Sequence, residues 1–242
     1  MKKIAYIKSD FGEKFGIPRQ SGIVDTKAVI IMEKEYRNPH AFNGIEGFSH
    51  LWLIWEFSKA VRENWSPTVL PPRLGGKTHV GVFATRSPFR PNPIGLSSVK
   101  LDKYEIDEKY GPVLYISGAD LMDGTPIYDI KPYLAYTDSH PDASMGFAGN
   151  IDEYRLEVII PDNLLLKLPV SKREVIKKIL AEDPRPSYQN DPMRRYGMSY
   201  AGYDIRFHVD GRVLTVCEIV SLEKAEHDNI EDNREDDRWQ EQ

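Results

Sequence analysis

Two arginines and three prolines fall within eight residues, Arg86 to Pro93, of the stretch Thr85-Arg-Ser-Pro-Phe-Arg-Pro-Asn-Pro-Ile-Gly95. Each proline fixes its own φ at about −65° and biases the preceding residue toward extended backbone. The segment is therefore a stiff, non-helical loop that presents the guanidinium groups of Arg86 and Arg90. Stiff loops often form binding surfaces, and the alternative is a rigid connection whose arginines pair with nearby carboxylates.

Charge is unevenly distributed along the chain. The formal net charge is −5, but nine acidic and three basic residues lie within residues 223–242 alone. Residues 64–100 contain no acidic residue. They carry five basic ones, Arg73, Lys77, Arg86, Arg90 and Lys100. Such a local positive field favours an anionic ligand such as RNA or a phosphate, although chance clustering gives the same pattern.

Another ionisable side chain, His50, lies inside the most hydrophobic segment, Phe48-Ser-His-Leu-Trp-Leu-Ile-Trp-Glu-Phe57. A histidine in such a run is usually a core residue with satisfied hydrogen bonds, and a direct catalytic role is the alternative. Apolar residues fall on both faces, so periodicity does not distinguish helix from strand. The aromatic and β-branched content favours a central strand.

Several common chemistries lack their sequence signatures. The single cysteine, Cys217, excludes an intrachain disulfide and a cysteine-rich metal site. There is no H-E-x-x-H, histidine cluster, dinucleotide or P-loop fingerprint, or nucleophile elbow, and we expect no metal. The N-terminus turns polar too early for a signal peptide, and the longest strongly apolar run, residues 51–55, is too short to span a bilayer. We therefore expect a cytoplasmic protein.

The elements that must position these residues are mostly short strands. We expect strands at 3–8, 28–33, 48–57, 80–84, 96–106, 112–121 and 126–134, one or two helical turns over 38–46, and a long loop over 62–79. Strand after strand with short turns predicts an antiparallel sheet that closes on itself rather than βαβ repeats.

The C-terminal part has a different pattern. We expect a strand at 154–160, a helix from Ser171 to Ala181 that begins with a capping box of Ser171 and Glu174, and a hairpin around Asp210-Gly211. The polar, glycine-bearing segment 137–153 predicts a linker with a domain boundary near residue 145. The predicted organisation is a β domain over 1–145, a small α+β domain over 146–222 and a disordered acidic tail over 223–242.

Several segments resemble the TsaA/TrmO/VirR-type family. The most specific is the Thr85–Gly95 loop. The others, in the family's order, are Pro18-Arg-Gln20, Gly47-Phe-Ser-His-Leu-Trp52, Pro71-Pro-Arg-Leu-Gly-Gly76, Asp123-Gly-Thr-Pro126, Asp129-Ile-Lys-Pro-Tyr133 and, as in bacterial members, Asp183-Pro-Arg-Pro186. Together they cover most of the chain.

The resemblance implies a mainly β fold, a single-sheeted antiparallel β-barrel with a small α+β C-terminal domain. TrmO-like members are S-adenosylmethionine-dependent tRNA methyltransferases. They methylate N6 of N6-threonylcarbamoyladenosine, just 3′ of the anticodon, in threonine tRNAs. They are homodimers with the cofactor near the subunit interface.

The resemblance also implies which residues hold the cofactor. Enterobacterial members have His-Gln where this chain has Ser58-Lys59, so that contact departs from the family pattern. By matching position, the cofactor site comprises Arg19, Gln20, Ser21, Ser58, Lys59, Arg86, Leu96, Asp123, Gly124, Thr125 and Pro126.

Methylation of a urea-like nitrogen must release a proton, so a base is useful. The sequence offers His50 and Asp123 as catalytic candidates, and Asp123 alternatively fixes the turn or binds the cofactor. Arg86 and Arg90 either clamp a carboxylate of the cofactor or threonyl group or hold phosphates. The candidate RNA contacts are Arg73, Lys77, Arg90 and Arg185. For Arg185, in the C-terminal domain, the alternative is an ordinary surface residue with no role in RNA binding.

Two other functions remain open from the sequence. The basic, acid-free stretch is also compatible with a non-catalytic RNA-binding module. The family fold is also compatible with a methyltransferase that acts on a different substrate.

Overall fold

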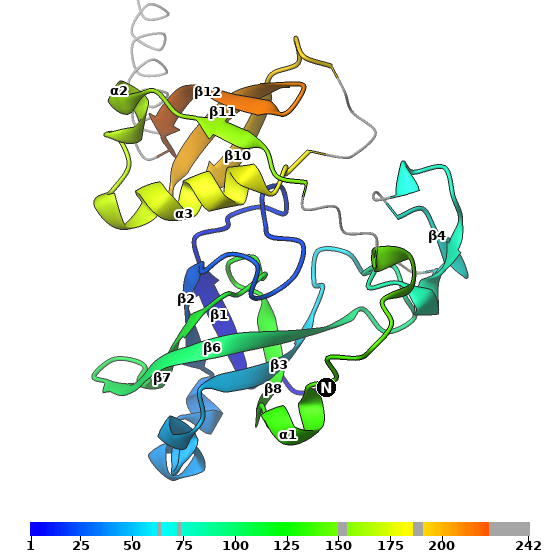
Figure 1. Cartoon of the computed structure of the whole chain (residues 1–242). Coiled ribbons are helices and arrows are strands. Elements are labelled where there is room, and N and C mark those ends of the chain that lie inside the picture. Colours follow the sequence, from blue (N-terminus) through cyan, green and yellow to red (C-terminus); the bar gives the residue numbers. More distant parts are fainter. Residues whose placement is uncertain (62–63, 72–73, 150–153, 186–190, 223–242) are drawn as a thin grey trace, which may run out of the picture.

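The computed structural model describes residues 1–61, 64–71, 74–149, 154–185 and 191–222. These residues form a β-barrel and a smaller sheet-and-helix module that lies over one end of the barrel (Figure 1). The predicted acidic tail, 223–242, and the candidate RNA contact Arg73 lie outside the described residues.

Six antiparallel strands form the barrel, in the order β1–β2–β7–β6–β3–β8, and β8 pairs back with β1. This confirms the predicted single-sheeted antiparallel barrel. The strands are β1 (Ala5–Ser9), β2 (Lys27–Met32), β3 (His50–Glu56), β6 (Ile94–Asp107), β7 (Gly111–Ser117) and β8 (Pro126–Pro132).

Strand β3 shows why its sequence is apolar on both faces. Leu51, Leu53 and Trp55 alternate into the barrel core and are buried. On the outer face Trp52 is half-buried, and its indole Nε1 donates a hydrogen bond to Asp138 Oδ2 at 2.8 Å. Asp138 belongs to the single-turn helix α1 (Ala135–Asp138), which follows β8 across this face. The segment after the barrel therefore covers part of its outer surface.

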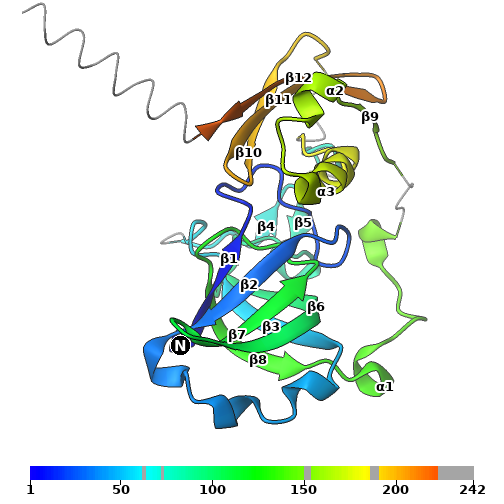
Figure 2. The ribbon, with the colours of Figure 1, turned by 90° about the vertical axis from the view of Figure 1, so that its left-hand side faces the viewer.

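The antiparallel order determines where the long connections lie. Strands β1, β3 and β7 run in one direction and β2, β6 and β8 in the other. The connections β1–β2 (residues 10–26), β3–β6 (57–93) and β7–β8 (118–125) consequently emerge at the same end of the barrel. Figure 2 shows the first of them, in blue, between the barrel and the C-terminal module.

The remaining N-terminal elements are small. The helical turns expected over 38–46 are 3₁₀ turns at Pro39–Phe42 and Ile45–Gly47, and another spans Lys34–Tyr36. The strand expected at 80–84 was predicted too long. Strand β5 (Val80–Gly81) pairs with β4 (Thr68–Val69), and a 3₁₀ turn, Val82–Ala84, follows because Val82 turns into a buried position.

The C-terminal module is a four-stranded sheet with helices, in agreement with the predicted α+β class. The sheet order is β10–β11–β12–β9, with β9 parallel to β12, and Gly211 with φ 57° forms the predicted hairpin turn. The elements are β9 (Glu157–Ile159), α2 (Asp162–Leu165), α3 (Val170–Ala181), β10 (Tyr196–Tyr200), β11 (Tyr203–Asp210) and β12 (Val213–Ser221), after a 3₁₀ turn at Gly146–Ala148.

The predicted capping box of α3 is wrong. The helix begins at Val170, with extended Pro169 as the N-cap and no side-chain cap hydrogen bond. Ser171 therefore lies inside the first turn, and Glu174 forms an ion pair with Lys177 at 3.1 Å instead. Proline at the boundary defines the start because its fixed φ is compatible with an extended N-cap.

The hydrophobic residues form two separate cores. One fills the barrel. The other lies in the C-terminal module, but it includes Phe11 and Val24, which come from the β1–β2 connection. The first loop of the chain is thus packed into the core of the last module. Each buried module residue of this core lies at least 130 residues after Phe11 and Val24 in sequence.

Candidate active site

The three connections at one end of the barrel enclose a cavity of about 610 Å³. This volume is within the usual range of small-molecule sites. Its lining residues come from the β1–β2 loop, the end of β3 with the turn after it, the proline-rich loop with the start of β6, and the β7–β8 turn. They are Lys14, Ile17, Pro18, Arg19, Gln20, Ser21, Trp52, Trp55, Glu56, Phe57, Ser58, Lys59, Ala60, Arg86, Pro88, Arg90, Ile94, Gly95, Leu96, Ser98, Asp120, Met122 and Thr125.

Aromatic rings and a glycine form one wall of this cavity. Gly95 pairs with Trp55 across β3 and β6. A Cβ built on Gly95 would lie 2.2 Å from Trp55 Cε2, so only glycine lets the indole lie against the strand. The ring of Phe57 packs against Trp55 with centroids 4.2 Å apart. This wall is suited to a flat, apolar part of a ligand.

A chain of hydrogen bonds links the aromatic wall to a half-buried carboxyl group, Asp120. Trp55 Nε1 donates to Ser97 Oγ at 2.9 Å, and Ser97 Oγ donates to Asp120 Oδ1 at 2.6 Å. Burial raises the pKa of Asp120 above its usual range. The Ser97 hydrogen bond, the backbone amides of Asp120 and Ser21, and the charge on Arg86 act in the opposite direction but do not cancel the effect of burial. Asp120 is therefore a carboxyl group with increased proton affinity, placed at the cavity.

Hydrogen bonds also join the loops around the cavity. Arg86 Nη1 donates to Gln20 Oε1, which ties the proline-rich loop to the β1–β2 loop. Lys14 Nζ donates to the carbonyl of Lys59 at 2.8 Å and ties the β1–β2 loop to the turn after β3. Arg90 Nη1 donates to the carbonyl of Thr85 at 3.2 Å, within its own loop.

A second carboxylate, Glu56, lines the cavity at the end of β3. Tyr128 on β8 donates a hydrogen bond from its hydroxyl to Glu56 Oε2 at 2.5 Å. This hydrogen bond, with burial and the charge of Glu56, raises the pKa of Tyr128 to about 12. Tyr128 therefore stays protonated at neutral pH and holds Glu56 in place.

The structure brings together most of the residues predicted to hold the cofactor. Arg86 and Leu96 line the cavity together with residues of the β1–β2 loop, and the Ser58-Lys59 pair lines the same cavity despite its departure from the family pattern. The predicted residues in the lining are Arg19, Gln20, Ser21, Ser58, Lys59, Arg86, Leu96 and Thr125.

Three predicted cofactor residues, Asp123, Gly124 and Pro126, lie outside the cavity lining. The turn is folded back onto β1: Asp123 Oδ1 accepts from the Ser9 amide at 3.0 Å, and Gly124 N donates to the Ile7 carbonyl at 2.9 Å. Met122 and Thr125, on either side of this pair, face the cavity instead. Asp123 therefore fixes the turn, which is the alternative that the sequence left open.

His50 also lies away from the cavity lining. It begins β3 with an exposed side chain, its Nδ1 is 2.9 Å from Ser49 Oγ, and its ring packs against Tyr133. The interpretation of His50 as a core residue is wrong, because β3 alternates and position 50 faces outward. Asp120, which the sequence analysis overlooked, lines the cavity. Its one sequence signal is a carboxylate in the turn directly after a buried strand.

The candidate RNA contacts have different surroundings. Lys77 is exposed near the β4–β5 pair, and Arg90 lines the cavity. Arg185 is only 6% exposed and pairs with Asp183 through Nε at 2.9 Å and Nη2 at 3.0 Å. The guanidinium of Arg185 is therefore engaged inside the module rather than exposed for the predicted RNA contact.

An antiparallel barrel with a ligand-sized, partly cationic cavity at its loop end belongs to the small-molecule-binding class of closed β-sheets. The chain belongs to the tRNA-methyltransferase O family: the model of the tRNA-methyltransferase O N-terminal domain matches residues 6–139, and that of the TrmO C-terminal domain matches residues 155–222. The predicted boundary near 145 falls between these matches and stays a prediction.

Relatives that this chain covers almost completely support the assignment. The chain is 39% identical over 230 residues to a tRNA (adenine(37)-N6)-methyltransferase of Escherichia coli K12, covering 92% of this chain and 97% of the relative. It is 43% identical over 177 residues to a protein of the same name from Eikenella corrodens, covering 73% and 99%. The crystal structure of TrmO from Pseudomonas aeruginosa matches with a TM-score of 0.71 and 33% identity over 90% of this chain and 97% of that one.

Proposed function

We propose that the cavity at the barrel end binds S-adenosylmethionine and that the chain methylates N6 of N6-threonylcarbamoyladenosine beside the anticodon of threonine tRNAs. By family and relatives, the chain is an S-adenosylmethionine-dependent tRNA adenine-N6 methyltransferase. The observation that carries the finer proposal is the convergence of three loops on one cavity with predicted cofactor residues on each of them.

The lining fits this cofactor chemically. Guanidinium groups of Arg19 and Arg86 suit its carboxylate, because arginine binds carboxylates with two parallel hydrogen bonds. The wall of Trp55 and Phe57 over Gly95 suits its adenine ring. Bound here, the cofactor would supply an electrophilic methyl group on a sulfonium. The chain's own contribution is then to fix the donor and acceptor in line, which can lower a barrier by several kcal/mol.

Asp120 is the residue that we assign to accept the proton from the acceptor nitrogen. Two carboxylates line the cavity, Asp120 and Glu56. Burial raises the pKa of Asp120 toward the operating pH, which makes its carboxylate the better base. Ser97 and Trp55 keep its side chain in one orientation. His50 and Asp123, the sequence candidates, lack this position.

The tRNA would approach from the basic side of the molecule. Arg90 at the cavity and exposed Lys77 near the β4–β5 pair belong to the acid-free stretch 64–100 and are suited to anticodon-loop phosphates. The target base lies in a single-stranded loop, where it can leave the stack at low cost.

Exposed apolar side chains beside the cavity support the homodimer. Leu96 lines the cavity yet is 59% exposed, and in the same β3–β6 connection that contributes to the lining, Phe83 is 72% exposed and packs against Trp65 with ring centroids 6.0 Å apart. A second copy covering this surface would close the cavity.

No helix in the described part of the chain is long and apolar enough to cross a membrane. Because the substrate is tRNA, we place the enzyme in the cytoplasm.

Methyl transfer from labelled S-adenosylmethionine tests the proposal. We expect incorporation into threonine tRNA that carries the threonylcarbamoyl group and none into the same tRNA without it. Incorporation into both would favour a different substrate. Binding of tRNA with no cofactor binding by calorimetry would favour a non-catalytic RNA-binding module.

Arg86→Ala separates the two interpretations of the proline-rich loop. We expect its Kd for the cofactor to rise by about tenfold, because a charge-assisted hydrogen bond is lost. A fall in tRNA affinity alone would show that Arg86 binds phosphate instead.

A further inference from the structure

The β1–β2 loop, residues 10–26, lines the cavity with one part and enters the C-terminal core with another. Phe11 packs against Tyr200 with ring centroids 5.5 Å apart, and Phe15 stacks on Phe207 at 6.5 Å. Phe11 is 1% exposed, and the barrel core contains none of these aromatic rings. The apolar side chains of the loop are therefore anchored in the module core, while hydrogen bonds such as that from the Gly22 amide to the Gly118 carbonyl, at 2.9 Å, connect its backbone to the β7–β8 turn.

Polar contacts reinforce the same anchoring. The amide of Ala201 donates to the Asp10 carbonyl at 2.8 Å, and the amide of Ser199 donates to Glu13 Oε1 at 2.7 Å. Lys172 of α3 forms an ion pair with Asp10. These contacts hold the stem of the loop, up to about residue 16.

The tip of the loop is held by a different part of the module. Arg19 Nη2 donates to the carbonyl of Asp183 at 3.1 Å. Asp183 follows α3 and has φ 50°, a conformation that costs energy for a residue other than glycine. The guanidinium of Arg185 binds both carboxylate oxygens of Asp183, at 2.9 and 3.0 Å. This bidentate pair fixes the turn whose carbonyl accepts the Arg19 hydrogen bond.

We propose that the Asp183–Arg185 turn is a positioning element for Arg19 and the cofactor loop. The C-terminal module then supports the methyl-donor site by fixing Arg19, which lines the cavity. Arg185 acts through Asp183 and Arg19 rather than on RNA. This inference rests on the proposed function, because it takes the cavity to be the S-adenosylmethionine site.

Lysine cannot replace Arg185 fully in this role. An ammonium group is a compact charge without the planar fork that binds two oxygens at once. Arg185→Lys should keep the charge balance in the module but leave the Asp183 turn less well fixed. The pair of variants Arg185→Ala and Arg185→Lys therefore tests geometry as well as charge.

The experiment compares these variants in the full chain by three measurements. Hydrogen exchange followed by mass spectrometry reports the order of residues 11–24, calorimetry gives the Kd for S-adenosylmethionine, and filter binding gives the Kd for tRNA. For Arg185→Ala we expect faster exchange in this loop and a cofactor Kd raised by about tenfold or more, with tRNA affinity within about twofold. Arg185→Lys should fall between wild type and Arg185→Ala.

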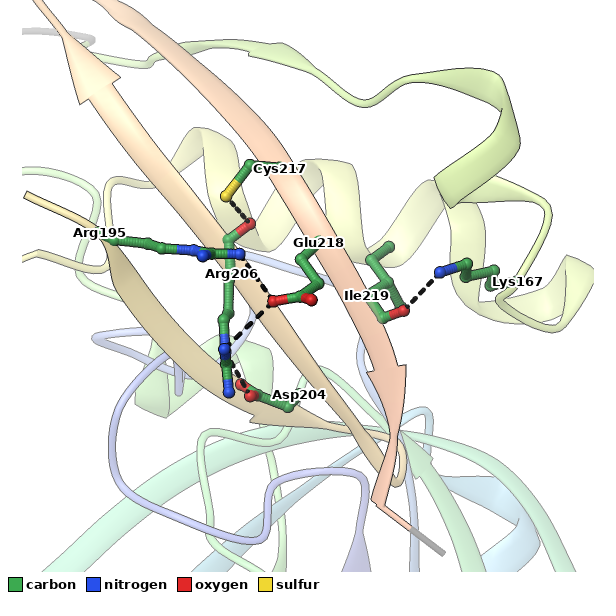
Figure 3. Close-up of polar contacts among 7 residues, drawn as sticks. All are labelled: Lys167, Arg195, Asp204, Arg206, Cys217, Glu218 and Ile219. Atoms are coloured by element: carbon green, nitrogen blue, oxygen red, sulfur yellow. Dashed lines mark hydrogen bonds and ion pairs between the residues drawn. The ribbon is translucent and has the colours of Figure 1, made fainter. Parts of the chain in front are cut away.

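A matched control lies on the exposed face of the same module. Arg206 pairs with Asp204 Oδ2 at 2.8 Å and with Glu218 Oε2 at 3.2 Å, in a network that Arg195 joins (Figure 3). Arg206→Ala removes an arginine ion pair from the module without touching the β1–β2 loop. We expect it to leave loop exchange and cofactor Kd unchanged.

The outcomes separate the two proposals. Unchanged exchange and cofactor Kd in Arg185→Ala would overturn the positioning role, and so would a loss of tRNA affinity alone. Absence of cofactor binding by wild type would overturn the proposed function, while the exchange data would still decide whether the turn orders the loop. If Arg185→Ala does not fold, the test uses Arg185→Lys and Asp183→Asn instead. Asparagine tolerates the positive φ at position 183, so the second variant removes the charge without straining the backbone.

Discussion

The two loops that meet at the cavity are held in place by different means. In the proline-rich loop, prolines alternate with short-range hydrogen bonds: the Ser87 amide donates to Thr85 Oγ1 at 3.3 Å and the Phe89 amide to Ser87 Oγ at 3.2 Å. The β1–β2 loop contains one proline, Pro18, and three glycines. Its shape comes from contacts with a module more than 100 residues away in sequence. The proline-rich loop is thus constrained mainly by its own covalent geometry, and the β1–β2 loop mainly by tertiary contacts.

Asp120 is where the two loops meet. The backbone amide of Ser21, from the β1–β2 loop, and the charge of Arg86, from the proline-rich loop, both act on its carboxyl group. A change at Asp120 should therefore affect the chemistry that depends on both loops. Changes away from Asp120 and from the Arg86–Gln20 contact should affect mainly the loop in which they are made.

The largest effect is expected for Asp120→Asn. Loss of a positioned base lowers rates by about 10²–10⁴-fold, so we expect kcat for tRNA methylation to fall by that factor while the cofactor still binds. Single-turnover kinetics measures the chemical step. The control is Asp142→Asn, an exposed carboxylate outside the cavity lining. Unchanged kcat in Asp120→Asn would remove Asp120 from the reaction.

The pH dependence gives an independent measure of Asp120. Since its pKa is raised in the folded state, the folded protein binds this proton more tightly than the unfolded chain, whose aspartate pKa is about 3.9. The carboxyl group's contribution to stability is present below that value and is lost as pH rises through the folded pKa. Wild-type stability relative to Asp120→Asn should therefore decrease with rising pH. Wild-type kcat should instead rise over the same interval, as the base ionises.

The next largest effect is expected for Phe11→Ala, which removes the anchor of the β1–β2 loop. Truncation of a buried phenylalanine costs about 3–5 kcal/mol. Urea unfolding measures the loss, and hydrogen exchange should show greater opening in residues 11–24 than in residues 86–93. Tyr136→Ala, at a side chain 87% exposed, is the control and should change stability by less than about 0.5 kcal/mol. An equal increase in hydrogen exchange in both loops would contradict the inference that the two loops are held in place by different means.

A smaller effect is expected for Gly95→Ala at the cavity wall. The new Cβ would overlap the Trp55 indole, and such overpacking costs about 1–3 kcal/mol. Displacement of Trp55 should change its fluorescence and break its hydrogen bond to Ser97. Gly81→Ala is the control, because its Cβ would meet no atom within 4 Å. If Gly95→Ala changes neither the stability nor the Trp55 fluorescence, the cavity wall can accommodate the added methyl group.

The smallest effect is expected for Pro91→Ala in the proline-rich loop. Removing an exposed proline whose conformation is compatible with the fold costs about 0.4–1 kcal/mol, mainly by enlarging the unfolded ensemble. Thermal unfolding should register this loss, and exchange in the β1–β2 loop should be unchanged. A larger loss than that from Phe11→Ala would reverse the comparison between the two loops.

Much of this protein was predictable from local sequence. Most strand positions follow from β-branched and aromatic composition, the antiparallel closure from a succession of strands with short turns, and the hairpin from Asp210-Gly211, all of which are local signals. The Thr85–Gly95 loop identified the family, and most cofactor residues inferred from that resemblance line the cavity. Strand β10 was missed because Gly197 and Ser199 give its short sequence little strand character.

The failures share a physical cause. The position of Asp120 after a buried strand does not reveal its environment, because its partners Ser97, Ser21 and Arg86 come from other segments of the chain. Asp123, three residues later, had the better motif but is turned onto β1 by backbone hydrogen bonds.

The sequence by itself determined the barrel, the stiffness of the proline-rich loop and the family, because alternation, proline geometry and a specific motif are local properties. Only the tertiary structure decided which carboxyl groups line the cavity, Asp120 and Glu56, and which contacts hold the β1–β2 loop. A pKa depends on burial and on neighbours brought together by folding. A loop with few constraints of its own takes its shape from the surface against which it packs, here the core of the C-terminal module.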